Sequence, residues 1–291
     1  DNKMRSLSTI CFSSCLLLIE ASAVAANPRI IGGTRVKSEE GPWMAALVYT
    51  NETALKGQYC GGTLIHPSWL LTAGHCTKNQ SEQDLKPDEI TVLLGTHNLR
   101  SEKTKPSERI RVIQIIRHPE YDGSDLNRPP LADIALLKLE HPYPQPILQV
   151  AASYSQLTDV RVRATVMGWG SISKYGNDYP DDLQQAEVPI TSNAVCNGRR
   201  SYHGMIQDNM LCAGYQRGEI DACVGDSGGP LMVPTNNGWR QVGIVSYGEG
   251  CAQPNYYGVY TRVSSFQQFI SDSVCSAEDI PAAPTLAVQI E

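Results

Sequence analysis

The chain has 291 residues, of which 41% are hydrophobic and 19% are charged, and its formal net charge at pH 7 is -6. This composition is typical of a globular protein and excludes an intrinsically disordered chain. The acidic balance argues against a nucleic-acid-binding protein and is compatible with attraction of basic substrates. The length fits one large domain or two small ones.

Residues 1–26 have the pattern of a secretory signal peptide. A basic start at Met4 and Arg5 precedes an apolar run over 11–19, and small residues follow over 21–26. The apolar run is too short to span a bilayer, and a buried core helix would not explain the basic start and alanine-rich end. We therefore expect a secreted protein, extracellular or periplasmic, with no stable membrane span in its mature form.

Short segments rich in β-branched and apolar residues, separated by Gly, Pro and Asn, predict strands along the chain. Clear examples are 90–94, 111–116 and 241–245. Apolar residues at helical spacing predict a helix only over 264–274. The predicted fold class is all-β with a C-terminal helix.

The stretch at 225–230, which reads GDSGGP, places Ser227 among three glycines and beside a carboxylate. Glycine allows tight turns that expose a hydroxyl and direct backbone N–H groups, so Ser227 is a candidate nucleophile. The same residue types also form ordinary turns. A nucleophilic serine needs a base and an orienting acid, and the candidates are His75 in LTAGHC and Asp133 before an apolar run.

These three segments, in the chain order His75, Asp133, Ser227, resemble the chymotrypsin–trypsin family of serine proteases. The resemblance implies a domain over 30–275 with two packed six-stranded antiparallel β-barrels and a C-terminal helix. It also implies that Ser227 attacks, His75 acts as the base and Asp133 orients His75. The backbone N–H groups of Gly225 and Ser227 would form the oxyanion hole.

The cysteines fit an exported protein, because an oxidising compartment allows disulfides. Spacing alone leaves their connectivity open. The family resemblance implies three pairs: Cys60 with Cys76, Cys196 with Cys212, and Cys223 with Cys251. Cys275 is then left as a free thiol, an intermolecular link or the partner of something outside this chain. A zinc site is disfavoured because no CxxC pair occurs, and we expect neither a metal nor another cofactor.

The junction after residues 27–29 resembles the activation site of the family. Cleavage between Arg29 and Ile30 would free an α-ammonium group, and the resemblance implies that this group pairs with Asp226. Breaking a buried ion pair leaves an uncompensated charge, so the pair suits a switch. We expect a zymogen that another protease, or the protein itself, activates.

The resemblance also implies the substrate pocket. Asp221 matches the residue at the pocket floor, Gly248 and Gly258 match wall positions that keep the pocket open, and Ser246 and Tyr247 border the substrate backbone. A carboxylate in a dehydrated pocket favours a long basic side chain. The expected partners are proteins or peptides with Arg or Lys before the scissile bond, and protein inhibitors.

Several segments depart from the pattern of digestive trypsins. The segment 122–132 is longer, and Thr96 replaces a carboxylate expected in the calcium loop, so we expect no calcium site. Residues 276–291 resemble a linker or a frayed terminus, and Asn51 and Asn79 lie in glycosylation sequons. The predicted function is a secreted serine endopeptidase. The alternative is a catalytically inert binding module with a protease fold.

Overall fold

A computed structural model describes residues 30–104, 106–125, 127–152 and 156–275. The predicted signal peptide at 1–26, the activation segment at 27–29 and the tail at 276–291 lie outside the described residues.

The first of two barrels closes in the strand order β2-β3-β4-β7-β6-β5, with antiparallel neighbours throughout. Its strands are β2 (Met44–Tyr49), β3 (Gln58–His66), β4 (Trp69–Thr72), β5 (Ile90–Leu94), β6 (Glu108–Arg117) and β7 (Ala135–Leu139). The predicted strand at 90–94 coincides with β5, and the one at 111–116 lies within β6.

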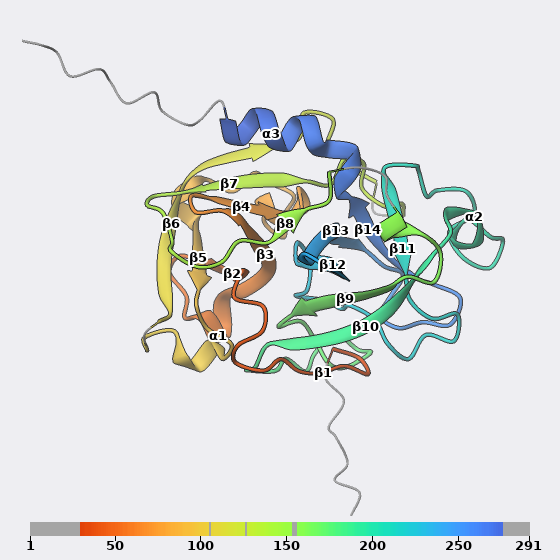
Figure 1. Ribbon diagram of the computed structural model, residues 1–291, viewed down its shortest axis with the longest axis horizontal. Helices are drawn as coiled ribbons and strands as arrows, with labels where there is room; N and C mark the ends of the chain where they lie inside the picture. The colour runs from red at the N-terminus through yellow and green to blue at the C-terminus, as the bar shows by residue number, and fades with distance from the viewer. Residues whose placement is uncertain (1–29, 105, 126, 153–155, 276–291) are drawn as a thin grey trace, which may run out of the picture.

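The second barrel packs beside the first (Figure 1) and runs β10-β11-β14-β13-β12-β9, closed by the β9–β10 pair. Its strands are β9 (Arg163–Gly168), β10 (Gln184–Thr191), β11 (Met210–Ala213), β12 (Pro230–Thr235), β13 (Gly238–Tyr247) and β14 (Gly258–Arg262). Two short strands extend it, β1 (Thr34–Arg35) on β10 and β8 (Gln149–Val150), which runs parallel to β13. The predicted fold of two six-stranded barrels is confirmed.

The strand β2 shows how the barrels meet. Ala45 and Leu47 belong to the core of the first barrel, whereas Ala46 and Val48 belong to a second cluster that includes Met232 of the other barrel. Successive side chains of a strand point to opposite faces, so β2 is buried on both. This explains why its sequence, MAALVY, is an apolar run without polar alternation.

The chain returns to the first barrel at its C-terminal end. The predicted helix at 264–274 is present as a 3-10 turn (Val263–Phe266) followed by α3 (Gln267–Cys275), which lies next to the end of β6 (Figure 1). Ile270 joins the core of the first barrel, and the His118 ring meets the Phe269 ring edge-on at 4.9 Å between centroids. Two further helices, α1 (Ala54–Gly57) and α2 (Asn193–Cys196), are too short to give a helical period in sequence.

Candidate active site

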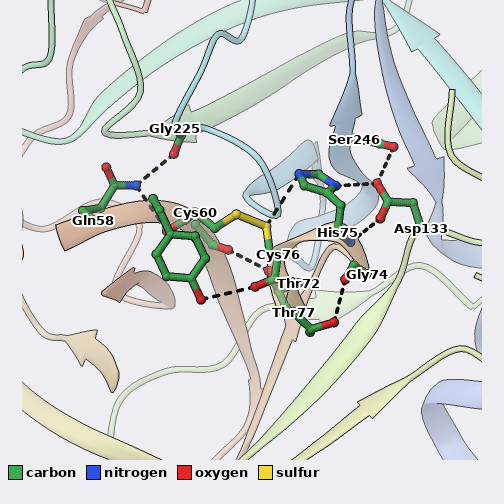
Figure 2. The surroundings of a disulfide bond; sticks show 12 residues. Gln58, Cys60, Thr72, Gly74, His75, Cys76, Thr77, Asp133, Gly225 and Ser246 are labelled. Atoms are coloured by element: carbon green, nitrogen blue, oxygen red, sulfur yellow. Dashed lines mark hydrogen bonds and ion pairs between the residues drawn. A yellow bond between two sulfur atoms is a disulfide. The ribbon is translucent and has the colours of Figure 1, made fainter. Parts of the chain in front are cut away.

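The His75 side chain is presented by a 3-10 turn, His75–Thr77, that follows β4. The Thr77 hydroxyl donates to the Gly74 carbonyl at 2.7 Å. Cys76, the residue after His75, forms a disulfide with Cys60 of β3. Figure 2 shows this disulfide beside the imidazole ring. The turn and the disulfide together fix the backbone from which the imidazole projects.

Asp133 receives hydrogen bonds on both carboxylate oxygens and is only 1% exposed. Its Oδ1 accepts from the His75 backbone N–H at 2.8 Å. Its Oδ2 lies 2.8 Å from His75 Nδ1 and accepts from the Ser246 hydroxyl at 2.6 Å (Figure 2). A carboxylate in this position keeps the ring proton on Nδ1 and leaves the Nε2 lone pair available to a proton donor.

The pKa of His75 reflects two opposing effects. Burial of the ring lowers the pKa, and the charge and hydrogen bond of Asp133 raise it, with the net result that the pKa is raised above its usual value of 6.5. The side chain keeps 29% of its surface exposed. The site therefore stabilises an imidazolium ion at His75 while part of the ring stays exposed.

Ser227 lies in a tight turn that packs against the first barrel. Its carbonyl accepts from the Gly61 N–H of β3 at 2.7 Å. The following residue, Gly228, has a φ of +78°, and a Cβ added there would lie 2.2 Å from Thr72 Oγ1 and 3.1 Å from Cys76 Sγ. Only glycine fits this contact. The close packing brings the segment with Ser227 next to the turn that holds His75.

The Ser227 hydroxyl and the His75 ring are not hydrogen-bonded to each other in the described part of the chain. Nε2 of His75 instead lies 3.8 Å from Sγ of Cys76. Hydrogen bonds between a catalytic base and its nucleophile are often long in a protein without substrate, and they shorten when the substrate binds.

The peptide groups around Gly225 are held so that N–H groups remain available. The Val224 carbonyl accepts from the Ser171 N–H at 2.8 Å. Because a trans peptide is planar, the Gly225 N–H points the opposite way from that carbonyl. Among the described residues, no protein acceptor receives the N–H of Gly225 or of Ser227. These two donors are the ones expected for an oxyanion hole.

Asp226 lies behind this turn and is fully buried. Its carboxylate accepts from the Gly170 N–H at 2.8 Å and the Cys223 N–H at 2.9 Å. Burial raises its pKa to about 7, although the two hydrogen bonds favour the ionised form. Added Cβ atoms at Gly168 and Gly170 would lie 2.1 and 2.4 Å from the Asp226 carboxylate, so both positions require glycine.

A cavity of about 400 Å³ extends from Ser227 to Asp221. Every predicted pocket residue lines it, namely Asp221, Ser246, Tyr247, Gly248 and Gly258. Asp221 is 6% exposed, and its Oδ2 accepts from the Ala252 N–H at 3.0 Å. Its Oδ1 has no hydrogen-bond partner among the described residues. Burial raises the pKa of Asp221 to about 7, although the hydrogen bond from the Ala252 N–H favours the ionised form.

The three disulfides of the structure join the pairs that the family resemblance implied, Cys60–Cys76, Cys196–Cys212 and Cys223–Cys251. The last pair lies in the cavity wall. Cys275, at the end of α3, is exposed and forms no disulfide with another described residue.

A model of the trypsin family matches residues 30–270 of the chain. The chain belongs to the trypsin family. It is 35% identical over 270 residues to "Serine protease 1" of Homo sapiens, which covers 90% of this chain and 97% of that protein. It is 36% identical over 252 residues to "Trypsin-3" of Salmo salar, covering 86% and 94% of the two chains. This trypsin-family chain is therefore a serine protease.

A third similar protein is longer. "Transmembrane protease serine 5" of Homo sapiens is 34% identical over 279 residues, which cover 90% of this chain but 56% of that protein. Among the described helices of this trypsin-family chain, none has the length and apolar character needed to cross a bilayer.

Two places in the described part of the chain bring together side chains of the kind that bind metals, and at each of them these groups already have other partners. Cys60, His75 and Cys76 lie close enough to share an ion, but both sulfur atoms are used in a disulfide, and a metal needs thiolates. In the loop that binds calcium in trypsins, Glu102 is already paired with Arg109 at 2.8 Å. Its carboxylate also accepts from the Ala54 N–H at 3.0 Å.

Two contributors to the site were missed by sequence analysis. The Thr261 hydroxyl of β14 donates to the Asp133 carbonyl at 2.6 Å, and the Gln58 amide of β3 donates to the Gly225 carbonyl at 2.9 Å. Neither residue lies in a motif, and each acts across more than 100 residues of sequence, since the separations are 128 and 167.

A larger cavity of about 980 Å³ lies between the segments 77–87 and 113–124, and Ser227 is not among its lining residues.

Proposed function

We propose that the protein is a secreted serine endopeptidase, made as a zymogen, that hydrolyses peptide bonds after Arg or Lys. The observation that carries the specificity is the unpartnered Oδ1 of buried Asp221, in a cavity that also reaches Ser227. A guanidinium or ammonium group on a long side chain would complete the hydrogen bonding of that oxygen. The inert binding module is not favoured, because the chain belongs to a protease family and retains all three triad residues.

The proposed reaction begins with the carbonyl carbon of the scissile peptide bond next to the Ser227 hydroxyl. His75 Nε2 takes the hydroxyl proton as Oγ bonds to that carbon, and the carbonyl oxygen becomes an oxyanion held by the N–H groups of Gly225 and Ser227. The C–N bond then breaks, and His75 gives its proton to the leaving amine. Water attacks the acyl-enzyme with His75 again as base, which releases the acid product and restores Ser227.

Zymogen activation is supported by the surroundings of Ile30. Its side chain is fully buried in the core of the second barrel with Val166 of β9, the strand that ends at Gly168 beside Asp226. Burial disfavours the ionised form of the Asp226 carboxylate. An α-ammonium group freed at Ile30 would lower the pKa of that carboxylate and favour its ionised form. Secretion is supported by the three disulfides and the predicted signal peptide.

A substrate panel tests the proposed specificity. With protein cleaved after Arg29 and peptides that differ only before the scissile bond, we expect kcat/KM for Arg and Lys to exceed that for Gln and Leu by at least about 100-fold. The Ser227→Ala variant serves as the inactive control. Equal rates for Leu and Arg peptides would contradict the proposed specificity, and absence of hydrolysis across the whole panel would favour the binding module.

The uncleaved chain is expected to be nearly inactive. We expect the Arg29→Gln variant, verified as uncut by mass spectrometry, to hydrolyse a peptidyl-arginine substrate about 100-fold more slowly than cleaved wild type. Without the pair between the Ile30 ammonium group and Asp226, we expect the oxyanion hole beside Asp226 not to be assembled. Loss of one oxyanion donor alone lowers turnover about 10²- to 10³-fold. If the uncut variant were as fast as the cleaved protein, activation by cleavage would be excluded.

A further inference from the structure

Gln58 connects the first barrel to the turn that contains Ser227. It opens β3, and its side-chain amide nitrogen donates to the Gly225 carbonyl at 2.9 Å and to the Cys60 carbonyl at 3.2 Å (Figure 2). Both neighbours are carbonyl oxygens, which only accept hydrogen bonds, so the amide nitrogen must face them. The contact therefore depends on a donor at this position.

The backbone of Gly225 can rotate more freely about φ and ψ than that of other residues, so neighbouring groups must restrain it. Its φ is +95°, and an added Cβ would lie 3.1 Å from the Cα of Gly170. Glycine loses more conformational freedom on folding than other residues, and only φ and ψ connect its two rigid peptide planes. The position can therefore hold a donor in place only if both planes are fixed.

The two planes are fixed by different partners. The peptide before Gly225 is held through the Val224 carbonyl by the Ser171 N–H at 2.8 Å, and it contains the Gly225 N–H. The peptide after Gly225 is held at both ends: its carbonyl accepts from Gln58, and its N–H, that of Asp226, donates to the Cys223 carbonyl at 2.9 Å. Loss of the Gln58 bond would leave rotation about ψ of Gly225 less restrained, and with it the orientation of the Gly225 N–H relative to the Ser227 N–H further along the turn.

We propose that Gln58 is a positioning residue for the oxyanion hole. Its amide holds the Gly225 carbonyl so that the N–H groups of Gly225 and Ser227 keep the mutual orientation needed to receive the charge that develops on the substrate oxygen. This role rests on the proposed function, in which Gly225 and Ser227 donate to that oxygen. Through it, β3 of the first barrel controls a catalytic donor that belongs to the second.

The test compares two ligands of the activated protein. A peptidyl-arginine aldehyde forms a hemiacetal with Ser227, and the hemiacetal oxygen uses the oxyanion donors. Benzamidine fills the Asp221 pocket alone. For Gln58→Met, which keeps the length of the side chain and removes the donor, we expect about tenfold weaker aldehyde binding and about tenfold lower kcat. This is less than the 10²- to 10³-fold effect of losing a donor outright. The Kd for benzamidine should change less than about twofold.

Two further variants separate a hydrogen bond from a packing effect. Gln58→Glu keeps the shape of the side chain but directs a carboxylate at two carbonyl oxygens, so aldehyde binding should be weaker than in Gln58→Met. The matched control is Gln267→Met. Gln267 also donates its amide to a backbone carbonyl, that of Ala151 at 2.8 Å, but from α3, and its loss should leave both ligands unaffected.

The outcomes are distinct. Unchanged aldehyde binding in Gln58→Met, equal loss of both ligands, or a Gln58→Glu variant as active as wild type would overturn the positioning role while leaving the protease function intact. A wild-type protein that neither cleaves peptides nor binds the aldehyde would overturn the proposed function, and the role of Gln58 with it.

Discussion

The Asp133→Asn variant is expected to hydrolyse a peptidyl-arginine substrate with a kcat about 10⁴-fold below that of the wild-type protein. This magnitude is carried over from serine-protease triads in general, where the amide holds the wrong imidazole tautomer. In this chain the carboxylate contacts both the backbone N–H and Nδ1 of His75, at 2.8 Å each. An asparagine that turns its amide nitrogen toward Nδ1 would place the ring proton on Nε2, where the lone pair is needed.

The same variant should also change the pH dependence of kcat/KM. In the wild-type protein the pKa of His75 is raised above 6.5, because the effect of Asp133 exceeds that of burial. His75 must be neutral to act as a base, so activity rises with pH and the acidic limb has its midpoint above 6.5. Removing the charge of Asp133 leaves burial, which lowers the pKa, and the limb should move to lower pH.

A matched control is Asp84→Asn. Asp84 is also an acidic residue paired with a cation, Arg117 at 2.7 Å, but its side chain is 66% exposed and does not contact His75. We expect this variant to keep wild-type kcat. A loss of less than about 100-fold in Asp133→Asn, or an equal loss in Asp84→Asn, would refute the assigned role of Asp133.

The residues predicted from sequence are those whose chemistry depends on local backbone. Gly228 permits the tight turn at Ser227, and Cys76 anchors the turn at His75, so each motif is readable within a few residues. The strand at 90–94 was predicted from its run of β-branched and apolar side chains, and all five of its residues are buried. At these positions the local sequence signal and the tertiary packing favour the same structure.

Contacts between distant segments could not be predicted in this way. The hydrogen bonds of Gln58 and Thr261 join residues 167 and 128 positions apart, and glutamine and threonine have no motif that announces such a role. The residue before Asp133 gives another example. Ala132 is buried and has a φ of +43°, a conformation that alanine disfavours and that its sequence does not indicate.

The loop at 122–132 was predicted only as a longer segment. The structure turns it into a closed loop in which Asp122 pairs with Leu131 across a bridge. The Arg128 guanidinium pairs with Asp122 and lies 3.7 Å from Asp125, which joins the two sides. Its length was evident from the sequence, but the ion pairs that define its shape depend on which side chains the turn brings together.

The Asp221→Ser variant is expected to lose the preference for basic substrates. The Asp221 carboxylate is buried, and removing one partner of a buried charge pair has an effect of about 2–5 kcal/mol. At the upper end of that range, kcat/KM for Arg and Lys peptides should fall roughly 10³- to 10⁴-fold, with a much smaller change for Leu peptides. The measurement is the ratio of kcat/KM for the two classes. Retained cleavage after Arg would disprove the assignment of Asp221.

The pH dependence of benzamidine binding gives an independent measure of the same carboxylate. Burial raises the pKa of Asp221 to about 7, so part of the population is protonated at neutral pH before a cation binds. A cation binds only the ionised form, so its affinity should be constant well above pH 7 and fall about tenfold per pH unit below it, with uptake of ligand releasing a proton. The His75→Ala variant should keep this slope, because His75 does not line the cavity that holds benzamidine, and Asp221→Ser should lose it. An affinity that is flat from pH 5 to pH 9 would mean that another group balances the charge of the ligand.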